Sequence, residues 1–319
     1  MTGGEIGGGD RRVGPMVLTV TLNAALDVTY RVPTLVPGAT HRVTEVAEQA
    51  GGKGVNVARV LRALGAPVIA TGLAGGAGGA RLRSLLAEEG VREAFVPIAA
   101  ESRRTVVVAE PDAATGLWEP GPTVTPDEWT AFRSRFADLV RGAEVVVLSG
   151  SLPPGVPVDA YRALIEAARE AGARTMLDSS GEALRHGLTA GPDLVKPNAE
   201  ELAGLLGRAL SRPAEAVGAV RALKARTVVA SFGPEGLLAV TERGSWHALL
   251  PHPVAGNPTG AGDACAAALA HGMIHHRPWP ERLADAVALS AAAVRAPVAG
   301  RVDLSDYRRL RRDVTIKEL

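Results

Sequence analysis

Uniformly apolar segments alternate with amphipathic segments along most of the chain. Residues 17–22 and 145–149 are β-branched apolar runs with the length of a buried strand. Between such runs apolar residues recur at helical spacing, as they do from Asn56 to Gly65. This rhythm predicts an α/β fold in which helices cover both faces of a mainly parallel central sheet. Further strands are predicted at 68–73, 174–178, 193–196 and 227–231, and helices at 78–89, 129–140, 158–171, 281–296 and 306–312.

Two parts of the chain alternate polar and apolar residues instead. Residues 28–32 and 41–48 flank a turn-rich segment, and residues 105–110 and 117–119 lie in a stretch that is poor in helix signals. Such alternation is typical of antiparallel strands with one face in water. We therefore expect a small β-sheet lid, formed from about residues 27–48 and 104–120, on a main domain that spans residues 16–319.

Composition narrows the class of protein. With 46% hydrophobic and 22% charged residues, the chain has the composition of a soluble globular protein. Its formal net charge of +1 gives no reason to expect nucleic acid or a membrane as a partner. The single cysteine, Cys265, excludes an intrachain disulfide and a cysteine-cluster metal site, which fits a cytoplasmic location. The glycine-rich residues 1–15 contain no apolar run and are expected to form a disordered tail.

The predicted parallel strands end in polar or glycine-rich clusters. These clusters are Ser149-Gly150-Ser151, Asp178-Ser179-Ser180-Gly181, Lys196-Pro197-Asn198 and Ser231-Phe232-Gly233. The carboxyl ends of parallel strands meet at one edge of a sheet, and ligands bind there. Asp27 follows the first strand and is a candidate ligand for sugar hydroxyls, although a turn aspartate is an alternative.

Two glycine-rich turns lead into predicted helices. In residues 257–263 the turn Gly260-Ala261-Gly262 precedes Asp263, and the free amide groups at a helix start suit an anion. A carboxylate at that point could take a proton from an attacking hydroxyl, although a capped helix is an alternative. In the second turn Gly51 and Gly52 let a ligand approach closely, and Asn56 in the first helical turn would face it.

Six blocks resemble the carbohydrate kinase family that includes ribokinase and the minor bacterial phosphofructokinase. They are residues 21–27, 51–59, 149–155, 178–184, 196–202 and 260–263, and they occur in the family's order. The resemblance implies a ribokinase-like three-layer αβα sandwich with a small β-sheet lid. It also implies an ATP-dependent sugar kinase that uses Mg²⁺.

The resemblance assigns roles to individual residues. Asp263 would be the general base, and the amides of Gly260, Ala261 and Gly262 would stabilise charge on the transferred phosphoryl group. Asn198 and Glu201 would order Mg²⁺ through water. The nucleotide side would comprise Lys196, Asn198, Ser231, Gly233 and Gly236, and the sugar side Asp27, Gly51, Gly52, Lys53, Asn56 and Ser151.

The first blocks and Glu119-Pro120-Gly121-Pro122 are most similar to the branch whose substrates already carry a phosphate. In this branch Arg104 would bind that phosphate, with Arg42 and Lys53 as helpers. Fructose 1-phosphate is the leading expected substrate. Fructose 6-phosphate and tagatose 6-phosphate are the close alternatives, and a free-sugar kinase or a non-catalytic sugar-binding protein is a more distant one. The lid strands predict a homodimer, because lids of this family commonly pair between subunits.

Overall fold

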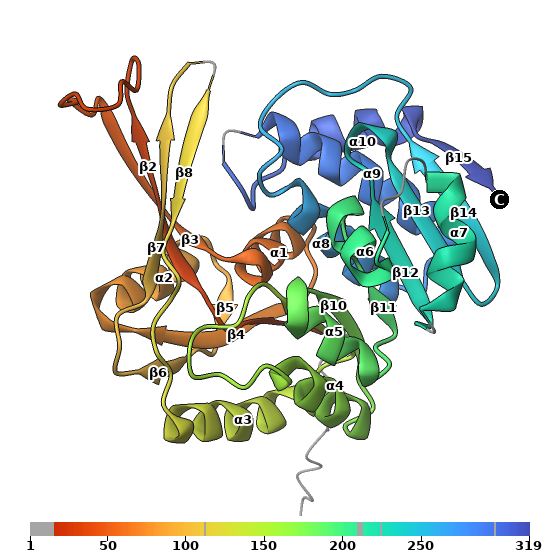
Figure 1. The fold of residues 1–319 in the computed structure, drawn as a ribbon, viewed down its shortest axis with the longest axis horizontal. Coiled ribbons are helices and arrows are strands. Elements are labelled where there is room, and N and C mark those ends of the chain that lie inside the picture. Colours follow the sequence, from red (N-terminus) through yellow and green to blue (C-terminus); the bar gives the residue numbers. More distant parts are fainter. Residues whose placement is uncertain (1–15, 112, 209–212, 224, 297) are drawn as a thin grey trace, which may run out of the picture.

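The computed structural model describes residues 16–111, 113–208, 213–223, 225–296 and 298–319. The expected tail, residues 1–15, lies outside the described residues. Most of the described chain forms one large sheet with helices on both faces, and a small sheet projects from it (Figure 1). The predicted α/β class, with its mainly parallel central sheet, is therefore confirmed.

The large sheet has the strand order β15-β14-β13-β12-β11-β10-β9-β1-β4-β5, and β6 pairs with β4 outside this path. From β5 to β12 neighbouring strands are parallel, whereas β13, β14 and β15 add an antiparallel edge. The bounds are β1 Val17–Thr21, β4 Val68–Gly75, β5 Arg92–Glu93, β6 Val96–Ile98, β9 Val145–Ser149, β10 Arg174–Asp178, β11 Leu194–Val195, β12 Thr227–Ser231, β13 Leu237–Thr241, β14 Gly244–Leu249 and β15 Thr315–Glu318.

Alternate residues of the central strands supply two separate hydrophobic cores. In β1, Val17 packs in the core beneath α1, α8 and α9, whereas Leu18 packs in the core beneath α3, α4 and α5. All five residues of this strand are buried, as expected for a parallel strand covered on both faces. The helices are α1 Lys53–Ala63, α2 Gly76–Glu88, α3 Pro126–Val140, α4 Ala160–Glu170, α5 Gly181–Thr189, α6 Ala199–Leu206, α7 Pro213–Ala222, α8 Ala261–Ile274, α9 Trp279–Arg295 and α10 Leu304–Asp313.

The small sheet has the order β3-β2-β7-β8 and comes from two separate segments of the chain. Its strands are β2 Ala25–Arg31, β3 Glu45–Gly51, β7 Arg103–Ala109 and β8 Ala114–Trp118. The sheet is mixed, because β2 pairs antiparallel with β3 but parallel with β7. β2 starts three residues earlier than the alternating pattern predicts, β3 starts four residues later, and β7 starts two residues earlier.

Among the described residues, no helix combines the length and the apolar character needed to cross a lipid bilayer.

Candidate active site

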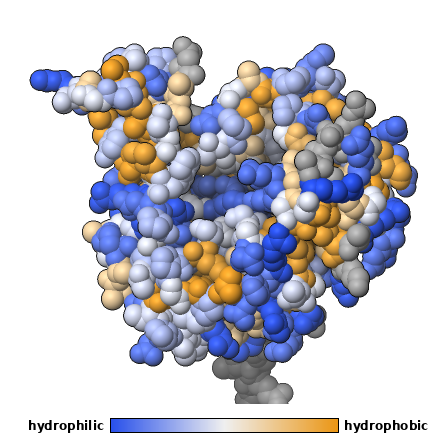
Figure 2. Space-filling model, viewed as in Figure 1, coloured by the Kyte–Doolittle hydropathy of each residue, from blue (hydrophilic) through white to orange (hydrophobic). Residues whose placement is uncertain are grey.

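The carboxyl ends of the parallel strands bring the polar clusters to one edge of the large sheet. Asp178 at the end of β10 lies beside Ser149 at the end of β9, and Ser231 at the end of β12 forms a bridge with Asn198. A surface hollow lies between the small sheet and the main body, and hydrophilic residues line its floor (Figure 2). The expected common edge is therefore present.

Helix α8 begins at this edge with an uncapped turn. Gly260 is its N-cap residue and has a φ of 86°, a left-handed conformation that favours glycine. No side chain caps the helix, so its first amide groups keep the anion-binding capacity of a helix start.

Asp263 lies in the first turn of α8 and is 7% exposed. The Asn56 side-chain amide, from the first turn of α1, donates a hydrogen bond of 2.9 Å to Asp263 Oδ2. Burial and the nearby Asp178 carboxylate raise the pKa of Asp263 to about 7, although Asn56 and two lysines oppose the shift. A carboxylate with such a pKa can exchange protons at neutral pH.

Asp178 forms the charged centre of the site. It is fully buried, and Lys53 Nζ lies 3.1 Å from its Oδ1 while Lys196 Nζ lies 3.3 Å from its Oδ2. Although burial opposes ionisation, Lys196 and Lys53 together hold the pKa of Asp178 below its usual range. The aspartate in turn raises the pKa of Lys53, so all three groups are charged at neutral pH. The sequence placed Asp178 in a polar cluster at the end of a predicted strand but gave it no role of its own.

Asn198 and Glu201 form a reciprocal capping box at the start of α6. The Glu201 amide donates to Asn198 Oδ1 at 2.8 Å, and the Asn198 amide donates to Glu201 Oε2 at 2.9 Å. The other carboxylate oxygen, Oε1, lies 4.0 Å from Lys53 Nζ. A cavity of about 330 Å³ opens beside this capping box, between α5 and α6.

Asp27 lies on the small sheet close to the glycine turn. A Cβ atom at Gly51 would lie 2.1 Å from Asp27 Cγ, so the Asp27 carboxylate lies directly against this glycine and a side chain there would displace it. Burial raises the pKa of Asp27 to about 6, against the opposing effects of a hydrogen bond from Thr105 and of the Arg103 and Arg59 charges.

The structure turns Arg103, rather than Arg104, toward Asp27. Residues paired in register share one face of a sheet, and Asp27 pairs with Thr105, two residues after Arg103. The Arg103 guanidinium donates hydrogen bonds to the carbonyl oxygens of Asn23 and Glu119, at 3.1 and 3.2 Å.

Arg104 lies on the opposite face of β7. It pairs in register with Leu26, which is buried in the core, and α2 packs against β2 on the main body. The Arg104 side chain is exposed to solvent. Arg104 therefore does not share the face of β7 that carries Arg103 and Thr105, and its expected role in phosphate binding stays a prediction.

The other expected residues lie in two places: at the carboxyl edge of the large sheet and beyond the far end of the small sheet. Ser151 Oγ accepts a hydrogen bond of 3.1 Å from the Asn23 side chain. Gly233 and Gly236 flank the tight turn that follows β12, and both have positive φ angles. Arg42 is exposed in the connection between β2 and β3, beyond the end of the sheet at which Arg31 pairs with Glu45.

The α/β fold and the polar edge of its large sheet define a sugar kinase. Residues 19–304 match the pfkB family carbohydrate kinases, so the chain belongs to that family. Escherichia coli phosphofructokinase-2, solved in complex with potassium, has a similar structure with 33% sequence identity and a TM-score of 0.88. The match covers 93% of this chain and 98% of that chain. A possible 1-phosphofructokinase from Thermotoga maritima is 27% identical with a TM-score of 0.84, over 95% of this chain and 99% of the other.

Proposed function

We propose that this chain transfers the terminal phosphoryl group of ATP to a hydroxyl of a phosphorylated ketohexose. The observation that carries the proposal is the buried Asp263, hydrogen-bonded by Asn56 in the first turn of an uncapped helix. Phosphoryl transfer needs a base for the attacking hydroxyl beside donors for the developing charge, and this turn offers both within one segment.

Asp263 acts as the general base in this proposal. The Asn56 hydrogen bond fixes the orientation of the Asp263 carboxylate. The raised pKa of Asp263, about 7, lies near neutral pH, where a general base works best. The amides of Gly260, Ala261 and Gly262 stabilise charge on the transferred group, because a helix start presents N–H groups to an anion. The Ala261 amide donates to the Pro258 carbonyl at 3.1 Å in this structure and exchanges that partner for the phosphoryl group in this proposal. Lys196 Nζ lies close to this turn, since a Cβ atom at Gly262 would be 3.6 Å from it.

Kinases of this family use ATP, and the nucleotide side of the proposed site lies at the ends of β11 and β12. Lys196 and Asn198 follow β11, and Ser231 with the turn of Gly233 and Gly236 follows β12. Gly233 has open space around it, which suits the approach of a flat base or a ribose, whereas Gly236 packs against the Ala248 carbonyl of β14.

The residues near α6 fit Mg²⁺ held mainly through water. Glu201 Oε2 is used within the capping box, but Oε1 is available to accept from a metal-bound water. The described residues contain no cluster of three or more histidine, cysteine or acidic side chains suited to a metal. Mg²⁺ often binds proteins through few direct ligands and keeps several waters, and it would neutralise phosphate charge here.

The sugar side of the proposed site includes Asp27, Gly51, Gly52, Asn56 and Ser151. Asp27 accepts from sugar hydroxyls, and the glycines allow the sugar to approach the start of α1. We assign the substrate phosphate to Arg103 in place of Arg104, since Arg103 shares the Asp27 face of the small sheet. Lys53 lies 3.1 Å from Asp178, and Arg42 lies in the exposed connection beyond the far end of the small sheet.

Fructose 6-phosphate is the first acceptor to test. The chain is more similar in sequence to E. coli phosphofructokinase-2, which has been solved in complex with fructose-6-phosphate, than to the possible 1-phosphofructokinase of T. maritima. This difference reverses the order expected from the motifs alone, and fructose 1-phosphate becomes the second candidate.

A coupled assay of ADP release with fructose 6-phosphate, fructose 1-phosphate, tagatose 6-phosphate and free fructose tests this proposal. We expect turnover with at least one phosphosugar and a kcat/KM about tenfold to a hundredfold lower with free fructose, the size of a lost charged contact. Turnover confined to free fructose, or absent with all four sugars, would contradict it.

The small sheet serves as a lid over the sugar in this proposal, and we expect it to pair in a homodimer. E. coli phosphofructokinase-2 has been solved as a tetrameric inhibited form, which makes self-association a reasonable expectation here. The lid assignment is supported by the position of Asp27 on the small sheet next to the glycine turn of α1.

A further inference from the structure

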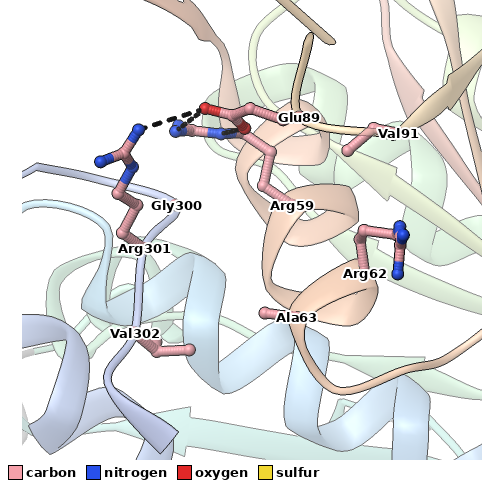
Figure 3. A pocket seen from close by; sticks show the side chains of 8 residues that line it. All are labelled: Arg59, Arg62, Ala63, Glu89, Val91, Gly300, Arg301 and Val302. Carbon is pink, nitrogen blue, oxygen red and sulfur yellow. Dashed lines mark hydrogen bonds and ion pairs between the residues drawn. The ribbon is translucent and has the colours of Figure 1, made fainter. Parts of the chain in front are cut away.

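Arg59 is a buried charged residue that the proposed chemistry does not use. It lies on α1 one turn after Asn56, and its side chain is 2% exposed. Two of its nitrogens donate to the Glu89 carboxylate, at 2.5 and 2.8 Å (Figure 3). Its remaining hydrogen bonds leave α1 in two directions, toward the small sheet and toward the segment before α10.

The first direction leads to the small sheet. Arg59 Nη2 donates a hydrogen bond of 3.0 Å to Oε1 of Gln49 on β3. Gln49 pairs in register with Asp27 and lies two residues before Gly51. Arg59 therefore holds the strand that pairs with Asp27 and that carries the glycine against which the Asp27 carboxylate lies.

The second direction leads to the turn before Asp263. Arg59 Nη1 donates a hydrogen bond of 2.9 Å to the carbonyl oxygen of Ala299. A Cβ atom at Gly260 would lie 2.9 Å from Cα and Cβ of Ala299, so this segment packs directly against the glycine turn. Gly300 is equally confined, because a Cβ atom there would lie 2.7 Å from Arg59 Nη1 and from Asn56 Oδ1.

The planar guanidinium is suited to holding these partners at once. It presents donors in a fixed fork, so two can bind Glu89 while others reach Gln49 and Ala299. Arg301 adds a weaker contact, 3.6 Å from Glu89, at the edge of a cavity of about 410 Å³ (Figure 3). A lysine at position 59 would keep the charge but could not reproduce this geometry.

We propose that Arg59 is a positioning residue that couples the small sheet to the glycine turn before Asp263. The coupling rests on the proposed function, in which the small sheet binds the sugar and Asp263 takes the proton. Through its hydrogen bond to Gln49, Arg59 positions Asp27. Through its hydrogen bond to Ala299, Arg59 positions the segment that packs against Gly260.

Steady-state kinetics of four variants test the coupling on the best acceptor found in the sugar panel. Arg59→Lys and Arg59→Ala should raise the sugar KM at least threefold and lower kcat at least tenfold, since small misplacements near a reacting centre cost up to about a hundredfold. Gln49→Ala should raise the sugar KM alone. Arg62→Ala is the matched control, because Arg62 lies on the same helix, is exposed, and among the described residues donates its side-chain hydrogen bond to the Gly90 carbonyl.

Hydrogen exchange supplies a readout that does not depend on the acceptor. Arg59→Lys should speed amide exchange in both β3 and residues 257–262, whereas Arg62→Ala should leave both unchanged. If Arg59→Lys lowers the melting temperature but keeps kcat, KM and exchange at these segments within twofold of wild type, Arg59 is only structural and the inference is overturned. Absence of turnover by wild type contradicts the proposed function instead, and the exchange data then decide the coupling alone.

Discussion

Asp263 is buried, and the hydrogen bond from Asn56 opposes the rise in its pKa that burial causes. If it is the general base, Asp263→Asn should lower kcat about a hundredfold to ten-thousandfold, because asparagine has nearly the same shape but cannot accept the proton. In wild type, kcat should fall as the pH drops below about 7, since protonation removes the base. Coupled-assay rates from pH 5.5 to 9 check both, and an unchanged kcat in the variant would end this assignment.

Asp263→Asn should raise the stability of the folded protein although it lowers kcat. The folded-state pKa of Asp263, about 7, lies above the ordinary value near 3.8, so the folded protein binds this proton more tightly than the unfolded chain. The resulting stability is full below about pH 4 and is lost as the pH rises through about 7. Asparagine never ionises, so the variant should melt above wild type at pH 8, with a smaller gap at pH 5. A variant that melts lower at pH 8 would indicate a misfolded site instead of a lost base.

Arg103 and Arg104 provide a test between adjacent residues of one strand. Arg103→Ala should raise the phosphosugar KM about tenfold to a hundredfold, the value of a charge-assisted hydrogen bond, while the KM for ATP changes little. Arg104→Ala, on the opposite face, should stay within threefold of wild type for both substrates. The reverse ranking in initial-rate kinetics would restore Arg104 to the site.

At the scale of elements, the sequence predicted best where burial dictates the pattern. Strands β9, β10 and β12 begin and end at the predicted residues, because a parallel strand covered on both faces must be apolar throughout. The antiparallel strands β13 to β15 were not predicted. Sequence distance explains only β15, which pairs with β14 across the chain, as in Thr315 with Leu249, whereas β12 to β14 pair through short local turns. The predicted start of β7 was two residues late, which left Arg103 and Arg104 outside the predicted strand, and their faces follow from the register of β7 with β2.

The candidate site was predictable where one short motif forms it. Asp263, Asn56 and the glycine turns occupy the expected edge, because strand ends and helix starts can be recognised from local sequence. The sequence assigned no role to Arg59 and none of its own to Asp178, since each has a partner more than a hundred residues away: Lys53 for Asp178, and Ala299 for Arg59. Sequence spacing does not reveal such pairs without the three-dimensional arrangement.

The start of α8 should tolerate no side chain at its N-cap. Gly260→Ala would place a methyl group 2.9 Å from Ala299 in a left-handed conformation that costs about 1–2 kcal/mol for other residues. We expect kcat to fall at least tenfold as the turn shifts. Gly172→Ala is the matched control, because Gly172 has a similar φ of 82° but open space around it. It should lose comparable stability in urea unfolding and keep its kcat, and equal losses of kcat in both variants would contradict this expectation.

At the scale of the whole molecule, the small sheet exposes apolar side chains. In the described part of the chain the exposed large hydrophobic residues include Val46, Leu117 and Trp118, at 58, 60 and 67% exposure. Val46 and Leu117 lie on the face opposite Asp27, since Val46 pairs with Tyr30, and Leu117 pairs with Val106, which itself pairs with Val28. Exposed apolar faces of this kind commonly mark contacts between proteins, and a second copy would also cover the free edge of β8.

We expect light scattering at micromolar concentration to give about twice the chain mass of 32.9 kDa. Combining Val46→Glu with Leu117→Glu should shift the mass toward the monomer, because charged groups placed opposite each other at a twofold interface repel and resist desolvation. Val158→Glu, on the main body and also exposed, should leave the dimer intact. A monomeric wild type, or a double variant that still dimerises, would mean that this face of the small sheet is not the subunit interface.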